Sequence, residues 1–303
     1  MPKTLRRVSV KAPLIKGTPL YYPDAVGLKY WAKLSPIFNA MTRETEAEVK
    51  LLFESPVAHW AGLEGVLRAR PNDPSPVAHW AGLPTQDASI SELSKALIER
   101  LRKKYLRIFD RDLGDIVLTM MTGVDKSSAA SLAGSLSKMG ESLTISPDYF
   151  VRSMGETFKA LTTQNVALFK TIASTHFDKV ETAVMDSIIS GNGLKDLNPF
   201  FETHSTGEKN YAKTRAMDQT RKAYTSVNMA RMRKLGIKKF EWIHSGGSND
   251  PRILHIELSG KQFFIDKPPF IGIMYGERIY GYPGQLPNCR CMASPVIEFD
   301  DDE

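Results

Sequence analysis

Apolar side chains recur at helical spacing through the middle of the chain, and the first such stretch has a clear start. Ser89 and Glu92 have the spacing of a capping box, in which each side chain accepts a hydrogen bond from the other residue's backbone N–H. The apolar positions then follow at steps of three and four residues: Leu93, Leu97, Leu101, Tyr105 and Ile108. We therefore predict a helix from Ser89, with its row of basic residues (Arg100, Arg102, Lys103, Lys104 and Arg107) forming a solvated face. The Ser-, Ala- and Gly-rich residues 125–145 favour a loop or a weak helix.

Two further helices are predicted downstream. One has an apolar side made of Val166, Phe169, Ala173, Phe177, Val180, Val184 and Ile188, and Gly191-Asn192-Gly193 ends it. His176 lies next to this stripe and is interpreted as a partly buried histidine. The other helix runs over residues 208–234 and has a seam of small residues: Ala216, Thr220, Ala223, Val227 and Ala230. Gly236 is its expected C-cap, and residues 237–243 read as a strand before shorter strands and loops.

The chain before residue 89 shows neither the helical nor the strand pattern of apolar residues clearly. Prolines punctuate the first 36 residues (Pro2, Pro13, Pro19, Pro23 and Pro36), which predicts an extended arm. A nine-residue segment then occurs twice, as Ser55–Leu63 and Ser75–Leu83. Each copy contains a His-Trp pair, and we interpret each as a turn and short helix whose tryptophan docks on the protein or a partner. A two-histidine metal site is the alternative, although no cysteine or further histidine lies near to complete it.

Composition excludes several classes of protein. The chain has 303 residues, 42% hydrophobic and 24% charged, which suits about two globular domains and not a disordered or collagen-like chain. Two cysteines one residue apart exclude a disulfide scaffold and fit a reducing compartment. No apolar run is long enough to span a bilayer, so we expect neither a membrane partner nor a signal peptide.

The net charge of +6 is unevenly distributed. Residues 1–45 carry 8 basic and 2 acidic side chains, and residues 191–240 carry 11 and 4. The last 63 residues carry 5 basic and 10 acidic ones and close on the acidic residues 300–303. Two separate basic segments therefore favour anionic partners. The second lies mostly on the helix of residues 208–234, where the candidate DNA- or portal-binding residues are Lys209, Lys213, Arg215, Arg221, Lys222, Arg231 and Arg233.

The C-terminal stretch contains an ordered set of motifs. A strand ends in Trp242, an Asp-x-Arg segment leads to a histidine, and a Leu-x-Gly, a Pro-Gly loop and Asn-Cys-Arg-Cys follow. The motif residues are Trp242, Asp250, Arg252, His255, Gly260, Pro283, Gly284, Pro287, Asn288, Cys289, Arg290 and Cys291. Over residues 205–297 this order resembles the phage head-morphogenesis family, the Mu F-like minor head proteins.

The resemblance implies a minor capsid protein of a tailed double-stranded DNA phage. Such a protein would reside in the virion, at the capsid interior or portal vertex, after assembly in the host cytoplasm. Its implied partners are the portal protein, the major capsid or scaffold protein, and double-stranded DNA.

The predicted fold class is α+β, with a mostly helical N-terminal half, an extended basic arm and a small α+β C-terminal domain. The expected organisation is an arm over 1–45, the duplicated segment over 46–86, a helical region over 87–200, the head-morphogenesis domain over 201–297 and an acidic tail over 298–303.

Three hypotheses remain open for the histidine and the two cysteines. The first is a reduced, metal-free cluster without a cofactor, in which His255 forms hydrogen bonds and the cysteines pack as small apolar side chains. The second is a zinc site made of His255, Cys289 and Cys291, with Asp250 or His244 as fourth ligand. The third is an enzyme, either a metal-dependent hydrolase or nuclease or a Cys-His hydrolase using the same residues. No nucleophile elbow, phosphate-binding loop or His-Glu-x-x-His motif occurs, so we expect a non-catalytic protein.

Overall fold

The computed structural model describes residues 14–54, 89–138, 155–247 and 250–298. The duplicated His-Trp segments and the acidic tail of residues 299–303 lie outside these ranges. The chain divides into two compact units. We call them the helical unit, from Gly27–Met120 and Ala160–Met217, and the sheet unit, from the described parts of Met1–Val26, Met121–Lys159 and Asp218–Glu303. Together they confirm the α+β class.

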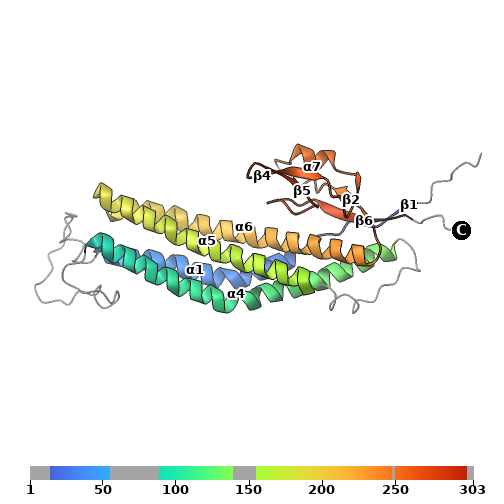
Figure 1. The fold of residues 1–303 in the computed structure, drawn as a ribbon. Coiled ribbons are helices and arrows are strands. Elements are labelled where there is room, and N and C mark those ends of the chain that lie inside the picture. The colour runs from blue at the N-terminus through green and yellow to red at the C-terminus, as the bar shows by residue number, and fades with distance from the viewer. Residues whose placement is uncertain (1–13, 55–88, 139–154, 248–249, 299–303) are drawn as a thin grey trace, which may run out of the picture. The chain divides into compact units, whose positions relative to one another are not determined.

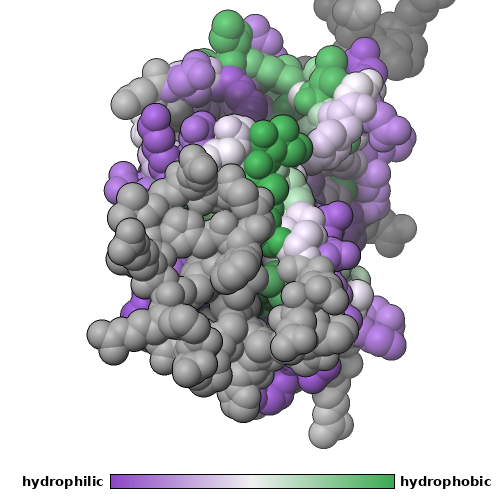
Figure 2. All heavy atoms as spheres, turned by 90° about the vertical axis from the view of Figure 1, so that its left-hand side faces the viewer, coloured by the Kyte–Doolittle hydropathy of each residue, from purple (hydrophilic) through white to green (hydrophobic). Residues whose placement is uncertain are grey.

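Four long helices supply most of the structure, and the stretches of them that belong to the helical unit run side by side (Figure 1). They are α1 (Asp24–Glu54), α4 (Ile90–Ser137), α5 (Gly155–Ser190) and α6 (Leu194–Lys234). Aromatic side chains from three of them meet in the core, with ring centroids 5.3 Å apart for Phe38 and Phe109 and 6.2 Å for Phe38 and Phe169. On the face drawn in Figure 2, hydrophobic residues reach the surface in a narrow strip between hydrophilic ones.

Helix α4 starts as the sequence predicts and runs further. The Ser89 backbone N–H donates to a Glu92 carboxylate oxygen at 2.8 Å, and the Glu92 N–H donates to Ser89 Oγ at 3.3 Å, which confirms the capping box. The helix continues to Ser137, so the loop or weak helix predicted from residue 125 is instead regular helix up to that point. Ser128 Oγ donates to Asn228 Oδ1 at 2.6 Å and Ser135 Oγ to the Thr18 carbonyl at 2.8 Å. These contacts of small residues offset their weak helix propensity.

Helix α1 corrects the arm that the prolines predict over residues 1–45, because the chain is helical from Asp24 onward. Pro36 lies inside this helix and cannot donate to the carbonyl of Ala32. Ser35 Oγ donates to that carbonyl at 3.4 Å and partly replaces the missing bond. The helix buries an apolar face, including Leu34 and Phe38 at 0% exposure, and this burial outweighs the unfavourable proline.

The remaining helix ends follow local rules. Gly191 and Gly193 have positive φ angles of 72° and 53° after α5, which confirms the predicted stop. Helix α6 begins at Leu194, earlier than the predicted residue 208. It ends in a Schellman motif, since the Ile237 N–H donates to the Met232 carbonyl and the Gly236 N–H to the Arg233 carbonyl. The predicted seam of small residues is buried at Ala216, Thr220, Ala223 and Val227.

The sheet unit contains a four-stranded antiparallel sheet of order β1-β6-β2-β3. These strands are β1 (Leu14–Lys16), β2 (Lys239–Ile243), β3 (Gln262–Phe264) and β6 (Met292–Glu298). A separate hairpin joins β4 (Phe270–Met274) to β5 (Glu277–Tyr280), and the short helix α7 (Ile253–Glu257) lies beside β4. Strand β2 confirms the predicted strand and alternates as expected, with Phe240 and Trp242 buried.

None of the described helices combines the length and apolarity needed to cross a membrane.

Candidate functional site

His255, Cys289 and Cys291 come together inside the sheet unit. Their ligand atoms all lie within 4.8 Å of one another, and each residue is 3% exposed. His255 Nδ1 is 3.4 Å from Cys289 Sγ and 3.7 Å from Cys291 Sγ. The structure therefore assembles the three residues that the motif spacing singles out and closes them off from solvent.

Backbone geometry brings these residues together from separate segments. His255 is on α7, whereas the cysteines are in the turn that leads into β6. Gly284 and Asn288 have positive φ angles of 81° and 60° in this turn, a conformation that a glycine adopts without strain and an asparagine tolerates. The Asn288 N–H donates to Asp218 Oδ1 on α6 at 3.0 Å, which fixes the start of the Asn-Cys-Arg-Cys motif.

The orientation of the His255 ring follows from its second nitrogen. Nε2 is 3.0 Å from the Ile271 carbonyl oxygen, which can only accept, so Nε2 carries the proton and donates. In the neutral ring Nδ1 then presents its lone pair to the two sulfur atoms. The Trp242 ring packs edge-on against His255 with centroids 5.1 Å apart and covers this side of the cluster.

The two thiols are electrostatically unequal. The hydrogen bond from the Cys291 thiol holds the pKa of Cys289 well below its usual value, helped by the Gly284 N–H against the effect of burial. The pKa of Cys291 is raised, because its proton is shared with Cys289 and because burial disfavours a second thiolate.

The two residues considered as a fourth ligand lie outside this cluster in the described part of the chain. Asp250 is exposed ahead of α7. His244 Nδ1 accepts a hydrogen bond from the Gly246 N–H at 3.2 Å, and the His244 N–H donates to Ser259 Oγ at 3.1 Å. His244 therefore has a local role in the turn after β2.

The other motif residues hold the surrounding loops. Arg252 donates to the Pro287 carbonyl at 2.9 Å, and the Gly260 N–H donates to the Trp242 carbonyl at 2.8 Å. The Pro283 carbonyl accepts from Thr225 Oγ1 at 2.9 Å, and Arg290 is exposed.

Two residues that lack a motif signal also support the cluster. The Tyr22 hydroxyl donates to the Cys291 carbonyl and lies 3.3 Å from Thr225 Oγ1. Tyr22 precedes α1, and only the tertiary structure brings it beside residues more than 200 positions away.

The basic residues predicted on the helix of residues 208–234 fall into two groups. Arg231 is 1% exposed and bonded to Asp125 at 2.5 Å, and Arg221 is buried between Asp24 and Asp218. Arg233 is exposed and contacts Asp266 at 3.2 Å. Lys209, Lys213, Arg215 and Lys222 are exposed or half-buried, with Arg215 stacked over Tyr211. The two buried arginines hold the sheet unit together and do not face solvent.

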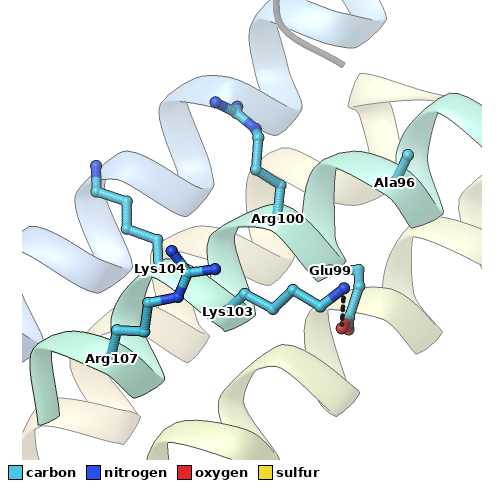
Figure 3. A pocket seen from close by; sticks show the side chains of 6 residues that line it. All are labelled: Ala96, Glu99, Arg100, Lys103, Lys104 and Arg107. Atoms are coloured by element: carbon cyan, nitrogen blue, oxygen red, sulfur yellow. Dashed lines mark ion pairs between the residues drawn. The ribbon is translucent and has the colours of Figure 1, made fainter. Parts of the chain in front are cut away.

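Four residues of the basic row on α4, Arg100, Lys103, Lys104 and Arg107, line a surface hollow of about 450 Å³, drawn in Figure 3. Most of its cations have acidic neighbours: Arg100 pairs with Glu48 at 2.8 Å, Lys104 with Glu44 at 2.5 Å and Lys103 with Glu99 at 3.4 Å. The row is therefore a largely neutralised helix face, in line with the prediction of a solvated face.

Comparison with known proteins finds a family that the motif region resembles. Residues 178–294 match the model of the family described as Phage Mu protein F like protein, which confirms the predicted resemblance. An uncharacterized protein of Haemophilus influenzae is 33% identical over 145 residues. The match spans 47% of this chain and 30% of that relative. No solved structure matches.

Proposed function

We propose that this chain, whose residues 178–294 match the Phage Mu protein F-like family, is a minor capsid protein of a tailed double-stranded DNA phage. In this role it acts in head morphogenesis and binds the portal protein while the procapsid assembles. The family match is the observation that carries the proposal. Contacts with the major capsid or scaffold protein, and a place in the virion, follow from the same role.

Exposed apolar side chains in the matched region support a protein partner. Six large hydrophobic residues with at least 46% exposure lie on α7, the β4-β5 hairpin and β3: Ile253, Ile256, Phe264, Ile273, Tyr275 and Tyr280. Tyr275, at the hairpin tip, is 99% exposed and has a positive φ angle of 53°. Large exposed apolar side chains are the ones that a protein partner can cover, and aromatic anchors often contribute much of the binding energy at protein interfaces.

The charge distribution favours a protein over DNA as the main partner. Three of the seven candidate basic residues, Arg221, Arg231 and Arg233, already pair with carboxylates inside the sheet unit. Phosphate contacts require accessible cations, and each one adds to the salt dependence of binding. Lys209, Lys213, Arg215 and Lys222 are the residues that a DNA contact would use.

The burial of the cluster supports a non-catalytic protein. A nucleophilic cysteine must be reachable by its substrate, whereas Cys289 and Cys291 are each 3% exposed. Asp250, which an enzyme would use as the orienting or metal-binding acid, is not among the residues grouped with them. The alternative of a hydrolase or nuclease therefore receives no support from the geometry.

The test is binding of the full chain to the portal protein of the same phage, co-expressed and analysed by size-exclusion chromatography. We expect a complex, and we expect Ile273→Ser with Tyr275→Ser to weaken it at least about tenfold, as removal of interface anchors does. Leu118→Ser is the matched control, since Leu118 is also exposed, at 55%, but lies in the helical unit.

Failure of the wild-type chain to bind the portal, or an equal loss in the control, would overturn the portal proposal. Binding to double-stranded DNA alone, with affinity that falls steeply with salt, would replace it with a DNA-binding role.

A further inference from the structure

We propose that His255, Cys289 and Cys291 bind a zinc ion that has a structural role in the sheet unit. The inference rests on the geometry of these side chains and does not depend on the proposed function.

The distances between the candidate ligand atoms suit tetrahedral zinc. Zn–S bonds of about 2.3 Å and Zn–N bonds of about 2.0–2.1 Å at the tetrahedral angle separate sulfur and nitrogen by about 3.6 Å. Nδ1 of His255 lies 3.4 Å from the Cys289 sulfur and 3.7 Å from the Cys291 sulfur. One distance is slightly shorter and the other slightly longer than the value expected for zinc. An ion could therefore be bound with shifts of only a few tenths of an ångström.

Each candidate ligand is oriented by a backbone group on its outer side. The His255 Nε2–H donates to the Ile271 carbonyl, the usual arrangement for a zinc-binding histidine, and this leaves Nδ1 free to bind the metal. The Gly284 N–H donates to Cys289 Sγ at 3.4 Å, and the backbone of Ser245 contacts Cys291. These donors stabilise thiolates, which are the metal-binding form of cysteine.

Charge selects the kind of ion. Two thiolates and a neutral imidazole carry a charge of −2, which a divalent ion neutralises, and a buried site must be close to neutral. Sulfur and nitrogen ligands favour zinc over magnesium or calcium, which prefer oxygen. A monovalent copper ion would leave a buried negative charge. The three side chains leave one tetrahedral position for a fourth ligand.

The position of the ion explains a structural role. It would join α7 to the turn before β6, and the β2 residue Trp242 packs on the same histidine. Cys289 and Cys291 are too close in sequence for a favourable disulfide, so a metal is the cross-link open to this pair.

The experiment measures zinc in the full chain purified under reducing conditions, followed by replacement with cobalt(II). We expect about one zinc per chain and, with cobalt, the intense near-ultraviolet absorption of thiolate-to-metal charge transfer. These two cysteines are the only ones in the sequence, so that absorption must arise from them. Removal of zinc by a chelator should lower the thermal unfolding temperature.

Variants locate the site. His255→Gln and Cys289→Ser should each reduce bound zinc at least about tenfold, since even outer contacts are worth 10–100-fold. His255→Cys should retain zinc and change the cobalt spectrum, and this variant separates loss of a ligand from loss of fold. His244→Gln is the control and should keep its zinc. The proposal would be overturned if the wild-type protein bound no zinc even when zinc is supplied in excess. It would also be overturned if both His255→Gln and Cys289→Ser retained their zinc.

Discussion

Two stacked histidines in the helical unit should make the protein sensitive to mild acid. His176 of α5 and His204 of α6 have ring centroids 5.0 Å apart, and His176 Nδ1 lies 2.9 Å from His204 Nε2. Lys179 and Glu208 are the charged neighbours, paired with each other at 2.5 Å. Burial, with smaller contributions from His204 and Lys179, lowers the pKa of His176 to about 3. Burial also lowers the pKa of His204, against the effect of Glu208.

The sign and size of the effect follow from proton linkage. A histidine has a pKa of about 6.5 when unfolded, so below that pH the unfolded chain binds a proton that folded His176 does not. The contribution of neutral His176 to the free energy of unfolding is therefore fully present above about pH 6.5. It is lost as the pH falls toward 3. At about 1.4 kcal/mol per pH unit, His176 alone should reduce the free energy of unfolding by about 2 kcal/mol between about pH 7 and pH 5.

The assay is urea unfolding followed by far-ultraviolet circular dichroism at both pH values. His176→Phe keeps an aromatic ring and removes the titrating group, so it should lose about 2 kcal/mol less than the wild type over this interval, whatever its stability at pH 7. His244→Gln, a change outside the stacked pair, should behave as the wild type does. Equal losses in the wild type and His176→Phe would refute the reasoning.

Three further substitutions test the packing of the sheet unit. Asp125→Ala should destabilise the protein by about 3–5 kcal/mol, because it leaves the buried Arg231 guanidinium without the Asp125 carboxylate, and Asp125→Asn should do so less, because its amide oxygen can still accept a hydrogen bond; urea unfolding measures both. Gly284→Ala should be destabilising by about 1–3 kcal/mol, since φ is 81° and the added Cβ would lie 2.1 Å from the Tyr22 hydroxyl; a thermal midpoint equal to that of the wild type would contradict this.

The candidate site was partly predictable from the sequence. The ordered motif singles out His255, Cys289 and Cys291, and the structure brings these three together. It does not bring His244 or Asp250 into the group, although their residue types suit zinc equally well. Side-chain type and spacing indicate which residues are able to bind, whereas the turn at Gly284 and the register of α7 decide which atoms converge.

Where the sequence contains a local helix signal, that signal correctly predicts the helix or the residue at its end. The capping box at Ser89 and the glycine after α6 act over one or two turns, and the apolar stripe of α5 repeats within that helix, so the sequence alone indicates all three correctly. The helix through Pro36 and the extension of α4 past residue 125 have poor local propensity, and their stability comes from burial and from hydrogen bonds to distant residues.

Only the tertiary structure decided which distant segments meet. Strand β1 pairs Leu14 with Glu298, and Tyr22 donates to the Cys291 carbonyl, contacts between opposite ends of the chain that no local pattern encodes. The tertiary structure also shows that the predicted basic helix offers fewer cations to a partner than its sequence suggests. Asp24, Asp125 and Asp218 neutralise its two buried arginines. The sequence by itself determined local periodicity and the residue types of the site. Partners, burial and charge balance depend on long-range contacts, whose energy exists only once the chain has folded.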